Sequence, residues 1–154
     1  MQRSFRLLAF SLVIMQAGCD SKQANEVTGT PAERIAIVTK IISGNTPMSS
    51  ELLDAHFVQD VTGAGEIGPP DVKSFGMLAV APADLPAWKA ILAPLEAHNA
   101  PTAYAAPKQA CPWWLTAAEF AKLEMYSPKS LTGRVKGWIG VAPDGRIFTY
   151  TYSM

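Results

Sequence analysis

The sequence has few of the residues that catalytic and metal sites require. It contains two histidines and two cysteines in 154 residues, and these lie far apart along the chain. It has no G-x-S-x-G, H-E-x-x-H, C-x-x-C or P-loop pattern. A metal site needs three or four ligands, usually of these types. The sequence therefore predicts no metal, no cofactor and no catalytic residue.

Net charge and long apolar runs are also missing. Thirteen Lys and Arg balance thirteen Asp and Glu, and charged residues make up 17% of the chain. This balance gives no electrostatic argument for nucleic-acid binding. The apolar stretch 7–15, in which only Ser11 is polar, has nine residues. Such a stretch spans roughly 14 Å as a helix, whereas about 20 residues are needed to cross a membrane. It is too short for a transmembrane helix.

The first residues do show a targeting pattern. Arg3 and Arg6 give a positive start, the apolar stretch follows, and the segment closes on Ala17-Gly18-Cys19. A basic start, a short apolar middle and a small-residue end are typical of a secretory signal peptide. An uncleaved anchor and a plain secreted protein are the alternative interpretations.

The end of this segment resembles the signal peptides of bacterial lipoproteins, which close on an apolar-small-small-Cys box. Ala17, Gly18 and Cys19 match the box, and Gln16 departs from its usual aliphatic residue. The resemblance implies cleavage after residue 18, a diacylglycerol on Cys19 and often an acylated new amine. It places the protein on a bacterial cell membrane, facing the periplasm or the cell exterior. In some enteric bacteria an Asp after the lipidated Cys, as Asp20 is here, favours the inner membrane.

The lipoprotein resemblance also divides the chain. Cleavage removes residues 1–18 and leaves 136 residues, enough for one domain. Two cations leave with the signal peptide, so the mature chain has a formal charge of −2. Residues 19–30 are polar and predict a flexible tether, and residues 31–154 predict a single domain.

Helix signals dominate the first part of that domain. Thr30 and Pro31 predict a helix start, and Ser43-Gly44 predicts its end. A second helix is expected after Ser49, with an apolar side formed by Leu52, Leu53, His56 and Phe57. Residues 63–68 spell G-x-G-x-x-G, but Pro69-Pro70 follow directly, so a glycine-rich loop is expected and not a dinucleotide site.

The later part mixes strands and helices. Residues 74–81 predict a buried strand, and Asp84 is expected to cap a helix that carries Trp88. Thr116 and Glu119 have the spacing of a capping box, which predicts a helix over 117–125. A β-hairpin is expected from residues 135–142 and 146–154, joined by Pro143-Asp144-Gly145. Together these elements predict an α+β fold: a small antiparallel sheet that includes the C-terminal hairpin, covered by about four helices.

Two sets of residues are candidates for function. Cations and an aromatic residue gather around the hairpin: Arg134, Lys136, Trp138 and Arg146. Arg and aromatic residues are common in protein interfaces, although a solvated face with Trp138 in the core is the simpler interpretation. Cys111 has no partner if Cys19 is lipidated, and its apolar neighbours favour a buried, inert thiol. A nucleophile pair of Cys111 with His56 or His98 is the alternative.

Three hypotheses follow for function. The first is a membrane-anchored envelope lipoprotein that binds a protein or envelope component without catalysis. An inhibitor or immunity role against a toxin or lytic enzyme would suit such a domain. The second is a small periplasmic hydrolase or thiol-dependent enzyme that uses Cys111 and a histidine. The third is a structural envelope component. In the first hypothesis the partners are the bilayer, through acylated Cys19, and a protein of the envelope.

Overall fold

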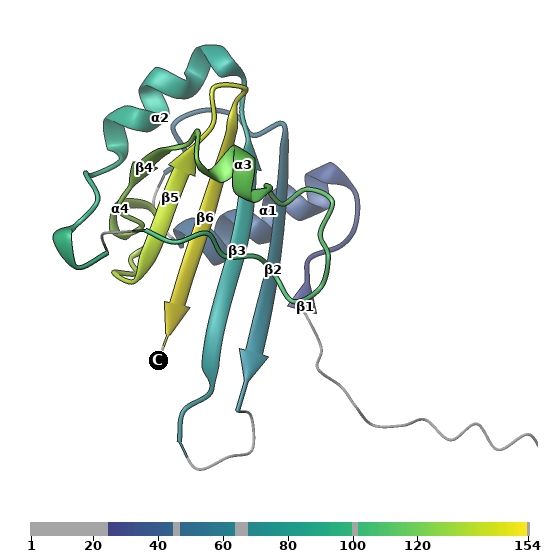
Figure 1. Cartoon of the computed structure of the whole chain (residues 1–154). Coiled ribbons are helices and arrows are strands. Elements are labelled where there is room, and N and C mark those ends of the chain that lie inside the picture. Colours follow the sequence, from purple (N-terminus) through teal and green to yellow (C-terminus); the bar gives the residue numbers. More distant parts are fainter. Residues whose placement is uncertain (1–24, 45–46, 64–67, 100–101, 154) are drawn as a thin grey trace, which may run out of the picture.

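The computed structural model describes residues 25–44, 47–63, 68–99 and 102–153 (Figure 1). The predicted signal peptide, Cys19 and the first part of the predicted tether lie outside these residues. So do residues 64–67, which form most of the G-x-G-x-x-G motif.

The described residues form one antiparallel sheet of six strands in the order β1-β2-β3-β6-β5-β4. The strands are β1 (Asn25–Glu26), β2 (Asp54–Thr62), β3 (Asp71–Ala79), β4 (Glu124–Tyr126), β5 (Gly137–Val141) and β6 (Arg146–Ser153). Neighbouring pairs run antiparallel throughout. This confirms the predicted α+β class with its C-terminal hairpin, β5 and β6.

Regular helices cover one face of the sheet. They are α1 (Pro31–Ser43), α2 (Leu85–Ile91), which follows the 3-10 turn η1 (Pro82–Asp84), and α4 (Lys129–Thr132). Side chains alternate between the two faces of a strand. Ala55, Leu78 and Ile147 therefore point to this face, where they pack with Val38 of α1 and Trp88 of α2. We call it the helix face.

An irregular segment covers the other face. Residues 102–116, named the strap, follow η2 (Ala97–Asn99) and lead into the short helix α3 (Ala117–Phe120). In Figure 1 the strap crosses β5, β6, β3 and β2 to the β1 edge and then turns back to α3. Its Trp114 and Leu115 pack on Phe75, Trp138 and Phe148 of the sheet. We call this side the strap face.

Two capping boxes begin helices in the described structure. The hydroxyl of Thr30 accepts from the N–H of Glu33, and Thr116 accepts likewise from Glu119. The start expected at Thr116 is confirmed, but the helix ends at Phe120 and not near Met125. The chain then tightens, as Leu123 N–H donates to the carbonyl of Phe120, and continues as β4. Asp84 makes no side-chain cap hydrogen bond, so its expected capping role is wrong.

The helix expected after Ser49 is also wrong, because this stretch becomes strand β2. Leu52, Leu53, His56 and Phe57 have helical spacing over barely two turns, which is too short to decide between periods. In β2 the alternation is two-residue: Phe57 faces the helices, whereas His56 and Val58 face the strap. Pairing with β1 on one side and β3 on the other fixes the extended form.

The C-terminal hairpin turns where the sequence predicts, at Pro143-Asp144-Gly145. Gly145 has a φ of 96°, a region that favours glycine, and a Cβ there would lie 2.2 Å from the carbonyl oxygen of Val80. The N–H of Val80 donates to the Gly145 carbonyl, so the turn is also tied to the end of β3.

The sheet begins earlier than the predicted domain boundary at residue 31. Asn25 and Glu26 pair with Gln59 and Val58 of β2, and the N–H of Val27 donates to the carbonyl of Phe57. Residues 25–30, expected in the tether, therefore belong to the domain. The reason is long-range pairing with β2, which a polar local composition does not reveal.

Candidate binding site on the strap face

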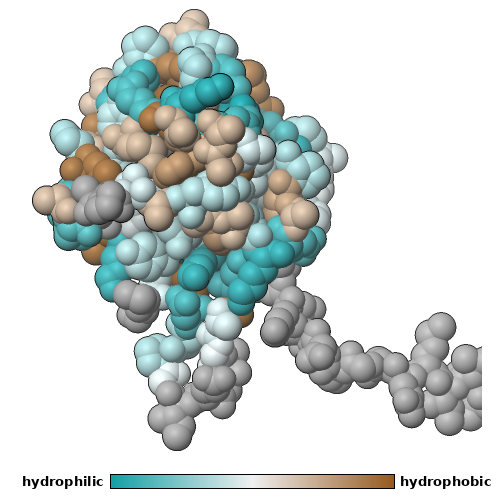
Figure 2. All heavy atoms as spheres, in the orientation of Figure 1, coloured by the Kyte–Doolittle hydropathy of each residue, from teal (hydrophilic) through white to brown (hydrophobic). Residues whose placement is uncertain are grey.

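A groove on the strap face has the size of a ligand site. Its volume is about 510 Å³, and small-molecule sites commonly measure roughly 300–1,000 Å³. Its floor is formed by side chains of β3, β6 and β5, and one wall is residues 102–106 of the strap, called the strap edge below. Figure 2 shows this face, with hydrophobic residues gathered over its upper middle and hydrophilic residues toward the lower end.

The floor of the groove consists of two rows of side chains that run across the strands. The pairing register places three aromatic residues in the first row: Phe75, Tyr150 and Trp138. The second row holds Lys73 opposite Tyr152. Gly137 permits β5 to approach β6 here, since its φ is 122° and a Cβ would lie 1.9 Å from the Tyr150 carbonyl oxygen.

The aromatic rings of the floor contact one another. The ring centroid of Tyr150 lies 5.1 Å from Phe75, 5.7 Å from Trp138 and 5.6 Å from Tyr152, on which it stacks. Offset and tilted pairs at such distances are favourable, and they hold the rings in fixed orientations. Phe75 and Trp138 are almost fully buried, whereas the tyrosines remain partly exposed. The floor is thus a rigid aromatic surface with hydroxyls at its exposed side.

Indole groups hold the strap edge in place. Trp138 Nε1 donates to the carbonyl of Ala103 at 3.2 Å, and Trp114 Nε1 donates to the carbonyl of Ala105 at 2.9 Å. The two acceptors are two residues apart, as expected when an extended chain presents alternate carbonyls to one side. Tyr104 adds a bond from its hydroxyl to the carbonyl of Leu115. Buried indole N–H groups usually find such partners, and here they fix a segment without regular structure.

Among the described residues that line the groove, Lys73 and His98 can carry positive charge and none is acidic. His98 lies near Glu96 and bonds to the carbonyl of Val135. Two carboxylates occur nearby on the same side of the sheet. Asp60 faces Lys73 in the register and accepts the backbone N–H of Lys108 at 2.9 Å. Asp71 lies two residues before Lys73.

Tyr150 remains protonated at neutral pH, because its pKa lies above the ordinary value of 10. Burial raises the pKa of Tyr150, and the neighbouring Tyr152 and Asp71 raise it further. Asp71 Oδ1 is buried and accepts no hydrogen bond from any described residue. The Tyr150 hydroxyl can therefore donate a hydrogen bond to a ligand.

The structure does not gather the predicted basic residues into one patch. Trp138 lies in the groove floor, whereas Arg134 borders a small cavity on the helix face beside Ile41 and Thr149. Lys136 directly precedes β5, and its carbonyl accepts from the N–H of Tyr152 at 3.4 Å. Arg146 begins β6, at the opposite end of the hairpin. Binding through Arg134, Lys136 and Arg146 remains a prediction, with these residues on separate surfaces.

Arg146 takes part in a local ion-pair cluster. Its guanidinium contacts Glu119 Oε1 at 2.9 Å and Asp144 Oδ2 at 2.8 Å, and it lies over the ring of Phe148. The backbone N–H of Thr116 and the side chain of Arg146 lower the pKa of Glu119 to about 2. The cluster joins α3 to the hairpin turn.

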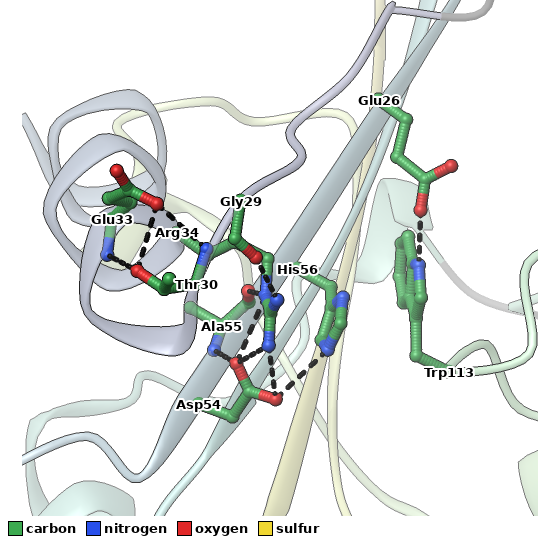
Figure 3. Close-up of polar contacts among 9 residues, drawn as sticks. All are labelled: Glu26, Gly29, Thr30, Glu33, Arg34, Asp54, Ala55, His56 and Trp113. Atoms are coloured by element: carbon green, nitrogen blue, oxygen red, sulfur yellow. Dashed lines mark hydrogen bonds and ion pairs between the residues drawn. The ribbon is translucent and has the colours of Figure 1, made fainter.

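A second polar network lies near the β1 edge (Figure 3). Arg34 of α1 binds both carboxylate oxygens of Asp54, at 2.6 and 2.8 Å, and Asp54 Oδ2 lies 3.1 Å from His56 Nε2. His56 stacks on Trp113 at 5.2 Å, and Trp113 Nε1 donates to Glu26 at 2.9 Å. The network links α1, two strands and the strap.

The network also accounts for the protonation state of Asp54. Burial opposes its ionisation, but hydrogen bonds from Arg34 and from the N–H of Ala55, with the positive charge of His56, outweigh burial and lower the pKa of Asp54. His56 has the partners expected of a satisfied imidazole, although on a strand and not on a helix.

Cys111 is partly buried and its sulfur donates weakly to the carbonyl of Gln109 at 3.4 Å. Burial, with the charges of Glu26 and Asp60, raises the pKa of its thiol to about 11. Reactive cysteines need the opposite shift. Within the described ranges, no three His, Cys, Asp or Glu side chains are placed to hold a metal ion. No described helix is long and apolar enough to span a membrane.

Comparison with protein-family models, curated proteins and solved structures finds no match to this chain. The site must therefore be understood from its own geometry.

Sequence reasoning missed most of the groove. Alternating Phe148, Tyr150 and Tyr152 mark an apolar face of the last strand, and this signal was available. Lys73 and the strap edge gave none, because their place depends on the pairing of β3 with β6 and on indole-to-carbonyl bonds.

Proposed function

We propose that this protein is a membrane-anchored lipoprotein of the bacterial cell envelope whose domain binds a ligand without catalysing a reaction. Acylated Cys19 is the anchor, and the groove on the strap face is the binding site. The observation that carries the binding role is the groove itself, with about 510 Å³ of space above a fixed aromatic floor. Sites of this kind combine apolar contact area with a few polar groups that orient the ligand.

The place where the chain enters the sheet supports this arrangement. Only residues 20–24 separate Cys19 from β1. Six extended steps reach about 20 Å, so the domain would remain close to the bilayer surface. The anchor joins the sheet at its β1 edge, while the groove lies over β3, β6 and β5. A ligand can therefore reach the groove while the protein is tethered.

The thiol-enzyme alternative has less support. At a pKa of about 11 for Cys111, only about one molecule in ten thousand would carry a thiolate at pH 7. No described contact pairs the sulfur with a histidine.

Lipid labelling tests the anchor. The full chain would be expressed in bacteria fed an alkyne-bearing palmitate, and the label would be read after membrane fractionation. We expect label in the native protein and in the matched control Cys111→Ser, and none in Cys19→Ser. Label that persists in Cys19→Ser would contradict the proposal, as would a native protein that carries no lipid.

A further inference from the structure

The length of the groove suggests what shape of ligand it takes. Adjacent strands lie about 4.8 Å apart, so the row from Phe75 across Tyr150 to Trp138 spans roughly 10 Å. An extended chain rises about 3.3 Å per residue, and three residues cover the same distance. The strap edge runs across the same three strands (Figure 1). A short extended chain that lies beside the strap would therefore run along this row and contact Tyr150, its partly exposed member.

The strap edge has backbone groups to offer such a chain. The carbonyls of Ala103 and Ala105 are used by the indoles. The backbone N–H and C=O groups of the alternate residues Thr102, Tyr104 and Ala106 make no hydrogen bond to any described residue. An extended segment with one unpaired side is a template for strand addition, in which main-chain bonds supply affinity and side-chain pockets supply specificity.

Charge indicates which end of the chain is held. Lys73 lies at the β3 end of the floor and forms no ion pair with another described residue. An ammonium group without a partner at the border of an apolar site can bind a carboxylate through charge-assisted hydrogen bonds. Asp60 and Asp71 lie nearby but do not line the groove. Their negative charges oppose a bound carboxylate and reduce the gain from its contact with Lys73.

We propose that the groove binds the C-terminal end of an extended peptide. About three residues pair with the strap edge, an apolar or aromatic side chain lies on Tyr150, and the terminal carboxylate contacts Lys73. This inference rests on the proposed binding function of the same groove and adds the class of ligand.

Three peptide libraries with identical side chains test it. Each contains N-acetylated tripeptides randomised over apolar and aromatic residues: one with a free C-terminal carboxylate, one amidated, and one with a free carboxylate and an N-methylated central residue. The full chain in detergent is mixed with each library, and retained peptides are measured by ultrafiltration and mass spectrometry. We expect the acids to exceed the amides about fivefold, as for a partly exposed ion pair. N-methylation should reduce retention about tenfold through lost backbone bonds.

Two lysine variants locate the carboxylate. Lys73→Met keeps the apolar stem and removes the charge, so acids and amides should be retained equally. Lys122→Met is the matched control, because Lys122 is exposed and does not line the groove. It should preserve the fivefold preference. A preference that survives Lys73→Met overturns the assignment of the carboxylate to Lys73.

The remaining outcomes separate this inference from the proposed function. If all three libraries are retained equally, the peptide neither pairs with the strap edge nor is held by its terminal carboxylate, and the inference is overturned. A tetramer of N-acetylglucosamine, included as a fourth probe, covers the saccharide alternative. If it binds in the groove and the peptides do not, the peptide inference fails and the binding function stands. If no probe is retained, the inference fails, and site-specific crosslinking in cells decides the binding function.

Discussion

The two faces of the sheet are closed in different ways. The helix face is covered by α1, α2 and α4, which make backbone hydrogen bonds within each helix and whose apolar sides enter a continuous core. The strap face is covered by a segment without regular structure. The indole N–H of Trp138 holds this segment to the sheet, and the indole N–H of Trp114 bonds within the segment. The helices hydrogen-bond part of their own backbone. The strap depends instead on side chains, one from the sheet and one from the strap itself.

This difference explains why the groove lies on the strap face. A helix satisfies its own backbone groups, whereas an irregular segment needs partners elsewhere. The strap finds partners for part of its backbone and leaves the groups of Thr102, Tyr104 and Ala106 without one in the described structure. Binding residues are commonly carried by loops on a rigid scaffold. Here the scaffold is the aromatic floor, and the helix face supplies its stability.

The largest expected effect is on the helix face. Trp88 is fully buried among the core side chains, and its indole donates to the hydroxyl of Ser50. Trp88→Ala should lower the free energy of unfolding by about 3–5 kcal/mol, because it removes a large buried side chain and leaves a cavity. Urea unfolding measures this. Ile91→Ala, on the same helix but 40% exposed, is the control and should cost less than about 1 kcal/mol. If both variants lose a similar free energy of unfolding, the claim that Trp88 belongs to a closed core is contradicted.

A smaller effect is expected where the strap is held. Trp114→Phe keeps an aromatic ring in the core and removes the N–H that binds the Ala105 carbonyl. The free energy of unfolding should fall by about 1–2 kcal/mol, and hydrogen exchange at residues 102–106 should become faster. Tyr104→Phe, which removes a more exposed bond to Leu115, is the comparison and should have less effect on exchange. Unchanged exchange in Trp114→Phe would show that the indoles do not hold the strap.

The smallest effect concerns the polar network near the β1 edge, in which Asp54 helps to link α1 to the strap. The folded-state pKa of Asp54 lies below its ordinary value of 3.8, so its stabilising contribution is present above that pH and is lost as the pH falls through the lower folded-state pKa. Asp54→Asn should cost about 1 kcal/mol at pH 7, for a charged hydrogen bond that is partly exposed. The difference in the free energy of unfolding between the variant and the native protein should become smaller below pH 3.8. Asp84→Asn is the control, since Asp84 forms no cap bond. If the difference in free energy of unfolding for Asp54→Asn does not change with pH, the ionised Asp54 carboxylate does not have this stabilising role.

Local chemistry allowed part of the fold to be predicted. The capping box at Thr116 and Glu119 and the turn at Pro143-Asp144-Gly145 are satisfied by residues within a few positions, so sequence alone suffices. Strand β2 was mistaken for a helix because its identity depends on partners in β3 that lie 9 to 25 residues away. The two residues of β1 depend on the same pairing.

The site was harder to predict than the fold. Trp138 was singled out for a surface of cations, and the structure places it instead in a groove floor with Tyr150 and Phe75. Its neighbours are set by the register of β5 with β6 and of β6 with β3. The strap edge depends on tertiary hydrogen bonds, and no local pattern in residues 102–106 indicates them.

The central claim is that the strap face, and not the helix face, is the binding face. A photoreactive benzoylphenylalanine in place of Tyr152, in the groove, can be compared in intact cells with the same residue in place of Ile37, which is 45% exposed on α1. Illumination should give a discrete adduct from position 152 and none from position 37. An adduct from position 37 alone, or equal adducts from both positions, would contradict the claim.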